Sequence, residues 1–222
     1  MKVTLFTILL ALLPYTSLLA QEPETYVKFD TNKGSFTVKL YNETPIHRDN
    51  FIKLVETHAY DDLLFHRIIK GFMCQAGGDI RDKDEHQKKY FKQKYDYTLP
   101  AEILYPLYYH KRGALAAARI GDEHNPERES SGIQFYIVTG EYFLDSDLRK
   151  YDTPERGTMP SEVREAYKTE GGAPHLDGAY TVFGEVVSGM KTIQKIESVP
   201  TDPEDRPVKD VYIRSAEIVK KP

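Results

Sequence analysis

The sequence has a single cysteine, Cys74, in 222 residues, so the chain cannot form an internal disulfide. Its stability must therefore come from packing. Cys74 lies between Met73 and Gln75 in an apolar run, a context that favours a small buried side chain. A nucleophilic Cys74 with His66 as its base is the alternative, but nothing in the sequence marks the thiol as exposed or electropositive.

The usual sets of catalytic residues are also lacking. The strands that carry polar residues offer no activated serine, no carboxylate pair and no histidine–cysteine cluster at ligand spacing, which argues against hydrolysis and metal catalysis. Residues 122–124 (Asp-Glu-His) and 202–205 (Asp-Pro-Glu-Asp) contain metal-binding residue types, but we interpret them as solvated turns. We expect the protein to use no cofactor and no metal.

No hydrophobic run is long enough to span a bilayer. Residues 3–13 are apolar apart from two threonines, follow Lys2 and precede a small residue, Ala20, which is the order of a secretory signal peptide. No cysteine follows the run, so a lipoprotein anchor is not indicated. We expect residues 1–20 to be a signal peptide of an exported protein, in the periplasm or outside the cell. The alternative is a buried N-terminal strand or helix.

An excess of positive charge is lacking too. Lys2 is the only charged residue in 1–20, so the remaining chain has a net charge of 29 − 34 = −5, which argues against a general nucleic-acid binder. Its 222 − 20 = 202 residues can form one large β or α+β domain. We expect a monomer with no stable membrane insertion.

Most of the chain has the pattern of short strands. Residues 26–30 and 35–40 flank a Thr-Asn-Lys-Gly turn and predict a hairpin, and Thr44-Pro45 predicts a helix start. A second helix is expected after Gly189. Further strands are expected at 63–69, 72–76, 114–120, 133–139, 180–187 and 208–219, with Phe65, Ile68, Phe135 and Phe183 in the core and His66 in a structural role. The pattern predicts a closed antiparallel barrel with helical caps.

Two long stretches interrupt the strand pattern, and we call them the first insertion (residues 80–112) and the second insertion (residues 141–173). Both are expected to be long loops that carry function or border a site, with a short helical pattern at 161–168 (SEVREAYK) in the second. The basic, aromatic run 88–95 could contact an anionic partner. A solvated loop with locally packed tyrosines is the alternative.

Arg67 stands in an apolar strand, where an arginine needs either an exposed edge or a partner. If residues 69–71 form a hairpin loop, Arg67 pairs with Met73, and alternation places Arg67, Met73 and Gln75 on one face. The same alternation places Gln134 and Tyr136 together. A guanidinium, amides and apolar side chains on one face fit an extended peptide that contains proline.

Four blocks carry a resemblance to a known family. FHRIIKGFMCQ at 65–75, GALAAAR at 113–119, GIQFYIV at 132–138 and HLDGAYTVFGEVVSGM at 175–190 resemble the cyclophilin-type peptidyl-prolyl cis-trans isomerases in order and spacing. The resemblance covers about residues 26–220, which we take as one isomerase domain. It implies a mainly β fold, an eight-stranded antiparallel closed barrel capped by two α-helices, and isomerisation of X-Pro bonds without a cofactor.

The resemblance also implies site residues. Arg67 matches the catalytic arginine, and Gln75 a glutamine that holds the substrate backbone. The implied substrate-binding residues are Phe72, Met73, Ala118, Arg119, Gln134, Tyr136, His175, Leu176 and Tyr180. Tyr136 departs from the family's phenylalanine, and we expect its hydroxyl to reach water or a polar neighbour at the pocket rim, because an unpaired buried hydroxyl costs about 1–3 kcal/mol.

Two functions follow, and both take proline-containing polypeptides as partners. In the first, an exported isomerase speeds the folding of secreted proteins: Arg67 meets the proline nitrogen only in the twisted state of an amide whose rotation barrier is about 18–20 kcal/mol. In the second, a peptide-binding module or holdase keeps the groove without turnover. Arg67 favours the first, whereas Tyr136 and the insertions leave the second open.

Overall fold

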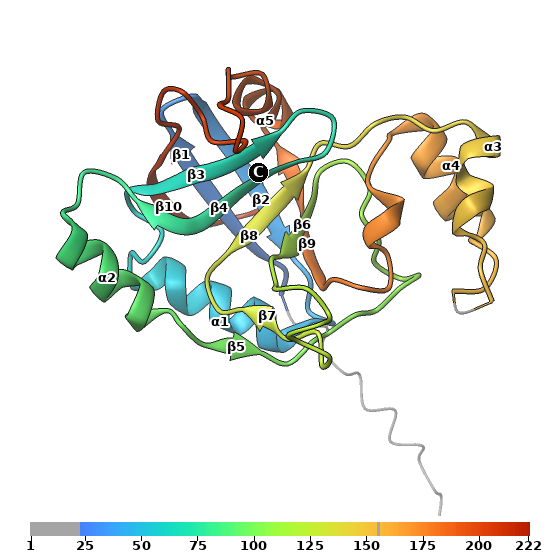
Figure 1. The fold of residues 1–222 in the computed structure, drawn as a ribbon, viewed down its shortest axis with the longest axis horizontal. Helices are drawn as coiled ribbons and strands as arrows, with labels where there is room; N and C mark the ends of the chain where they lie inside the picture. Colours follow the sequence, from blue (N-terminus) through green and yellow to red (C-terminus); the bar gives the residue numbers. More distant parts are fainter. Residues whose placement is uncertain (1–22, 155) are drawn as a thin grey trace, which may run out of the picture.

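The computed structural model describes residues 23–154 and 156–222, so the expected signal peptide lies outside the described residues. Its centre is one antiparallel sheet of eight strands in the order β10-β1-β2-β9-β6-β8-β4-β3 (Figure 1). The strands are β1 (Thr25–Thr31), β2 (Gly34–Leu40), β3 (Leu63–Ile69), β4 (Met73–Ile80), β6 (Ala114–Ala117), β8 (Phe135–Val138), β9 (Val182–Ser188) and β10 (Ile213–Val219). Each strand that the sequence predicts is therefore present, with bounds shifted by a few residues.

The sheet is an open half-barrel, so the expected closed barrel is wrong. Its edge strands β3 and β10 share only an isolated bridge, Leu64 with Tyr212, and single backbone hydrogen bonds such as that from Phe65 N–H to Val211 O at 2.8 Å. Two register shifts in β3 between Leu63 and Arg67 disrupt its ladder, and such irregularities bend and twist a strand. No continuous ladder joins the two edges.

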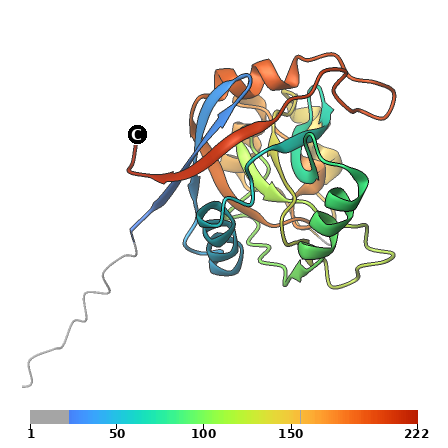
Figure 2. The same cartoon turned by 90° about the vertical axis from the view of Figure 1, so that its left-hand side faces the viewer.

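The two expected helices cover the core inside the curved sheet. α1 (Pro45–Glu56) begins at Pro45 after Thr44, and α5 (Met190–Glu197) follows Gly189, as the sequence predicts. In Figure 2 they lie at opposite ends of the curved sheet. All four predicted core residues are confirmed, and Cys74 is also buried: Phe65, Ile68, Cys74, Phe135 and Phe183 are each at most 3% exposed. Burial raises the pKa of the Cys74 thiol, which argues against a nucleophile.

The insertions are not the long loops that we expected, because both contain helices. The first holds α2 (Glu85–Lys94), which begins at a capping box formed by Asp84 and Gln87, and β5 (Thr98–Leu99), which pairs with β7 (Ser130–Ser131). The second holds α3 (Asp145–Leu148), η1 (Arg149–Tyr151) and α4 (Ser161–Thr169), so the helical pattern at 161–168 is confirmed. The structure thus has three α-helices beyond the two caps that the resemblance implied.

The second insertion has an apolar centre of its own. Val163 and Tyr167 of α4 pack with Leu148 and Met159, all at most 5% exposed. Figure 1 shows α3 and α4 to one side of the sheet, far from α2. Among the residues that the structure describes, no helix has the length and hydrophobicity needed to cross a membrane.

Candidate active site

The β3–β4 hairpin positions Arg67. Arg67 pairs with Gln75 and Ile69 with Met73, so the hairpin loop is residues 70–72 and the expected pairing of Arg67 with Met73 is wrong. Gly71 stands at the centre of this loop with φ 72°, a conformation that glycine adopts without steric cost. The pairing differs from the expected one by two residues, and two is the side-chain period of a strand. Arg67 and Gln75 therefore still lie on one face.

The outer face of the sheet carries a small pocket of about 110 Å³, which we call the proline pocket. Nine of the eleven predicted site residues line it, and they come from β3, β4, β8 and the segments around residues 118 and 176–180. They are Arg67, Phe72, Met73, Gln75, Ala118, Arg119, Tyr136, Leu176 and Tyr180. Residues from all four sequence blocks thus converge on one cavity.

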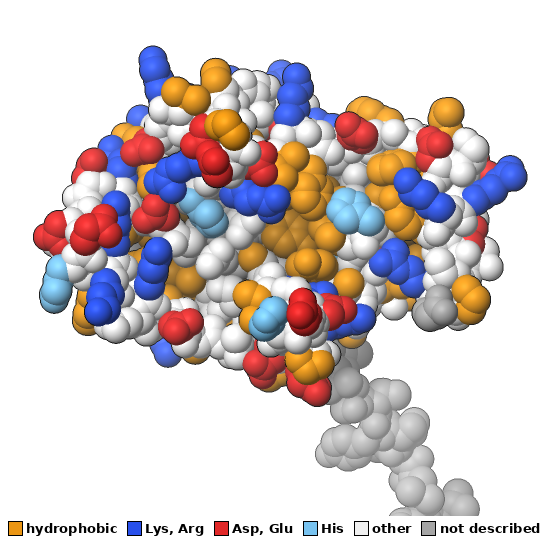
Figure 3. Space-filling model, viewed as in Figure 1, with side chains coloured by type: hydrophobic (Ala, Val, Ile, Leu, Met, Phe, Trp, Pro, Cys, Tyr) orange, Lys and Arg blue, Asp and Glu red, His pale blue; other side chains and the backbone are white. Residues whose placement is uncertain are grey.

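The floor and walls of the proline pocket are apolar and rigidly packed. Met73 is 2% exposed, Tyr136 4% and Leu176 9%, and they pack in one cluster with Ala114 and Ala116 of β6. Figure 3 shows a hydrophobic hollow near the middle of this face, with basic side chains and a histidine at its border. Such a cavity fits a small apolar ring with a polar backbone at its edge.

The other two predicted residues lie beside the proline pocket. Gln134 accepts a hydrogen bond at Oε1 from Nε2 of Gln75 at 3.0 Å, so the two amides fix one another's orientation. His175 is exposed, and its ring lies 5.0 Å from the ring of Phe72 between centroids. Burial lowers the pKa of His175, with a smaller contribution from His110.

Arg67 has a partner that the sequence did not reveal. Its side chain is 44% exposed, and Nε lies 3.4 Å from Oδ2 of Asp205. Asp205 belongs to the predicted turn, where Oδ1 of Asp202 accepts the backbone N–H groups of Glu204 and Arg206 at 3.0 and 2.9 Å. No local signal could have found this contact, because 138 residues separate the two side chains.

Arg119 lines the proline pocket, but most of its side chain packs against other residues of the protein. Its side chain is only 4% exposed and forms an ion pair with Asp122 at 2.6 Å, while Nε donates to the carbonyl oxygen of Ala179 at 2.8 Å. The guanidinium also lies over the ring of Tyr180, 4.3 Å from its centroid. Arg119 therefore holds Tyr180 at the edge of the proline pocket.

The hydroxyl of Tyr136 has a polar neighbour, as expected, but this partner is buried and does not lie at the pocket rim. Oη lies 3.0 Å from Nε2 of His110, which is 1% exposed. Nδ1 of His110 donates to Oδ1 of Asp177 at 2.9 Å. Burial raises the pKa of Tyr136, so its hydroxyl stays protonated. With the Nδ1 proton of His110 directed at Asp177, the hydroxyl donates to Nε2. Neither His110 nor Asp177 was predicted from the sequence.

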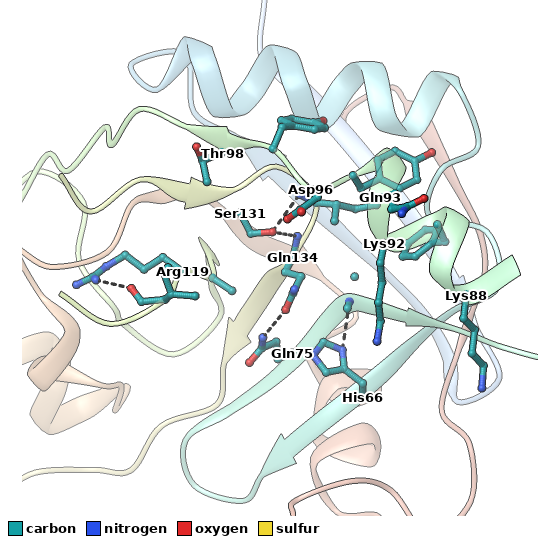
Figure 4. Close-up of a pocket in the computed structure, with 18 of the residues that line it drawn as sticks. His66, Gln75, Lys88, Lys92, Gln93, Asp96, Thr98, Arg119, Ser131 and Gln134 are labelled. Carbon is teal, nitrogen blue, oxygen red and sulfur yellow. Dashed lines mark hydrogen bonds between the residues drawn. The ribbon is translucent and has the colours of Figure 1, made fainter. Parts of the chain in front are cut away.

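A larger groove of about 930 Å³ borders the proline pocket and shares Gln75, Ala118 and Arg119 with it. One wall is α2, with Lys88 and Lys92, and Gln75 and Gln134 lie on the other side (Figure 4). His66 also borders this groove; its Nδ1 accepts the backbone N–H of Gly78 at 3.3 Å, which confirms its structural role. The first insertion therefore widens the surface on which a peptide could lie.

Comparison with known proteins decides the family. The model of the family "cyclophilin type peptidyl-prolyl cis-trans isomerase/CLD" matches residues 26–218. This chain belongs to that family of enzymes. A putative peptidyl-prolyl cis-trans isomerase of Staphylococcus aureus is 32% identical to this cyclophilin over 200 residues, which are 89% of this chain and 93% of the relative.

Other relatives differ in length or are more distant. A peptidyl-prolyl cis-trans isomerase-like 2 of Rhizopus delemar is 32% identical over 203 residues, which are 90% of this chain but only 30% of that protein. The crystal structure of a cyclophilin-type isomerase of Cryptosporidium parvum has a TM-score of 0.62 at 22% identity and covers 90% of this chain and 100% of that one. A second structure of that protein, in the presence of the dipeptide Ala-Pro, has a TM-score of 0.61 at 22% identity. It covers 88% of this chain and 99% of that one.

Proposed function

We propose that this cyclophilin accelerates cis-trans isomerisation of X-Pro bonds in exported proteins and so assists their folding. The observation that carries the proposal is the position of Arg67 at the edge of an apolar pocket on the outer face of the sheet. The structure of the Cryptosporidium relative in the presence of Ala-Pro supports a proline-containing peptide as the ligand. The pattern of residues 1–20 supports export to the periplasm or the cell exterior.

The proline pocket holds the ring while the X-Pro amide bond rotates. Phe72, Met73, Tyr136 and Leu176 surround the ring with apolar surface, which excludes water from one side of the amide. Gln75, oriented by Gln134, presents its amide to the substrate backbone. Rotation is then confined to one bond, because both of its ends are held.

Arg67 supplies the contact that favours the twisted amide. The planar amide keeps the nitrogen lone pair in resonance with the carbonyl, so a planar proline nitrogen accepts no hydrogen bond. In the twisted state the nitrogen becomes pyramidal, and its lone pair accepts a hydrogen bond from a guanidinium N–H. This contact exists only near the transition state, and such a contact raises kcat rather than binding alone. The contact of Nε with Asp205 orients the group.

A peptide-binding module without turnover is the second candidate, favoured by the large groove beside α2. The decisive experiment measures cis-trans exchange of the peptide Ala-Ala-Pro-Phe with the chain that begins at residue 21. Faster exchange than in the uncatalysed peptide supports the isomerase. Binding of the peptide without faster exchange would support only the peptide-binding module. A second assay follows the refolding of a client protein whose refolding rate is limited by proline isomerisation. Refolding that is no faster with the chain present would count against a folding role.

A further inference from the structure

A chain of buried polar side chains joins the second insertion to the proline pocket. Tyr167 on α4 donates its hydroxyl to Oδ2 of Asp177 at 2.6 Å. Oδ1 of Asp177 accepts from Nδ1 of His110, and Nε2 of His110 contacts the hydroxyl of Tyr136. The four residues are 0–4% exposed, and each polar group is satisfied by the next. Desolvation raises the pKa of Tyr167, aided by the nearby Asp177 carboxylate, so this hydroxyl stays a donor.

Arg156 makes a second connection. Its Nη1 donates to the carbonyl oxygen of Pro174 at 3.0 Å, and its Nη2 to that of His175 at 2.9 Å. Both carbonyls belong to η2 (Pro174–Leu176), the short turn that presents Leu176 as a wall of the proline pocket. The second insertion therefore holds this turn at its start through Arg156, and just past its end through Asp177.

The turn needs such support. A 3₁₀ segment of three residues has few internal hydrogen bonds, and their geometry is poorer than in an α-helix. The position of Leu176 must then be set by groups outside the turn. The same chain passes through His110, near the end of the first insertion, and ends at Tyr136. The second insertion is thus connected to two lining residues of the proline pocket without lining the cavity itself.

We propose that the second insertion is a positioning element for the proline pocket: through Arg156, Tyr167, Asp177 and His110 it fixes Leu176 and Tyr136 at the separation that accepts a proline ring. This inference rests on the proposed isomerase function. The four residues are positioning residues, because none of them lines the cavity. A loosened pocket loses binding to the ground state and the transition state alike, so KM rises while kcat changes little.

The test uses Tyr167→Phe, Arg156→Gln and the double variant in the chain that begins at residue 21. Tyr167→Phe removes one hydroxyl and keeps the ring in its apolar cluster, so the fold is retained. For each single variant we expect KM for Ala-Ala-Pro-Phe to rise about 3- to 10-fold, as for the loss of one positioning hydrogen bond, and the double variant to exceed both. Tyr26→Phe is the matched control: it removes the hydroxyl of a buried tyrosine on the far strand β1, which donates to Glu24 just before that strand, and it should leave KM unchanged.

A lower midpoint of thermal unfolding with an unchanged KM in all three variants would overturn the proposal and reduce the second insertion to a stabilising role. If the wild-type chain binds the peptide without turnover, the proposed function fails, and the Kd of the same peptide decides the inference. A Kd raised in Tyr167→Phe and Arg156→Gln but not in Tyr26→Phe supports it, and an equal Kd in all of them overturns it. A wild-type chain that does not bind the peptide overturns both.

Discussion

The side chain of Arg67 is partly exposed, and a contact with Asp205 orients its guanidinium. Its side chain is 44% exposed, so its loss leaves no cavity in the core, whereas its contact with Asp205 restricts where the guanidinium points. We expect Arg67→Ala to remain folded and to lower kcat/KM about 10²–10³-fold, equal to about 3–4 kcal/mol of transition-state stabilisation. Arg67→Lys keeps the charge without the planar fork of donors and should recover only part of the rate. Exchange kinetics on a proline peptide check both, and an unchanged rate in folded Arg67→Ala would falsify the mechanism.

Two substitutions of Tyr136 distinguish its role in substrate binding from its role in the stability of the fold. Tyr136→Phe keeps the ring that forms the pocket wall but removes its hydrogen bond to His110, so we expect kcat to change little and KM to rise by no more than in Tyr167→Phe, about 3- to 10-fold. It leaves Nε2 of His110 buried without its partner, which should cost about 1–3 kcal/mol of unfolding free energy. Tyr136→Ala removes the wall itself and should lose most binding. Denaturant titration and peptide kinetics on both variants give the two quantities, and a large fall in kcat in Tyr136→Phe would show that the hydroxyl contacts the substrate.

Among the elements, β4 depends on one glycine for its position. Gly77 has φ 94°, and a Cβ there would lie 2.5 Å from the carbonyl oxygen of Ile133. β4 leaves its regular pairing with β3 at this point, just beyond Gln75, and the close approach of the two backbones fixes where Gln75 points. The sequence has Ala-Gly-Gly at residues 76–78, and no local pattern shows which of the two glycines takes the left-handed conformation.

Gly77→Ala should therefore lower the free energy of unfolding by more than the cost of the left-handed backbone conformation alone. A non-glycine residue at positive φ costs about 1–2 kcal/mol, and a forced clash in a packed region adds about 1–3 kcal/mol. Gly157 is the matched control, because its φ is 73° and a Cβ there meets nothing within 4 Å. Gly157→Ala should show only the backbone cost. Urea unfolding of both variants checks this, and equal losses would mean that the approach to Ile133 is not tight.

Across the whole molecule, local patterns predicted the elements and missed how distant parts meet. The alternation in 63–69 and the proline at Pro45 act within one strand or one turn, so these elements were predicted. The open edge between β3 and β10 and the contact of Asp205 with Arg67 depend on residues more than 100 positions apart, which no local pattern records. The resemblance located the pocket residues but could not locate His110, because it supports a tyrosine that replaces the family's phenylalanine.

The histidines give the whole molecule a pH-dependent stability. Burial lowers the pKa of His47 and His66 below the ordinary value of about 6.5. The unfolded chain therefore binds more protons than the folded chain as the pH falls through about 6.5, and the free energy of unfolding decreases with it. The stability is fully present above about pH 7 and is lost between that pH and the lower pKa values of the folded state. Carboxylates whose pKa values are lowered by hydrogen bonds and ion pairs, such as Asp152, add their own loss only at more acidic pH.

We thus expect the midpoint of thermal unfolding to fall from pH 7.5 to pH 5.5, and His66→Asn to reduce that fall. Asparagine can still accept the N–H of Gly78 at its side-chain oxygen, as Nδ1 of His66 does, but it takes up no proton. The matched control is His58→Asn, because His58 is 74% exposed. Its replacement should leave the pH dependence close to that of the wild type, because it removes no buried imidazole. Calorimetry at pH 7.5, 6.5 and 5.5 separates the three chains, and a fall that is the same in His66→Asn as in the wild type would mean that His66 is protonated as readily in the folded state as in the unfolded one.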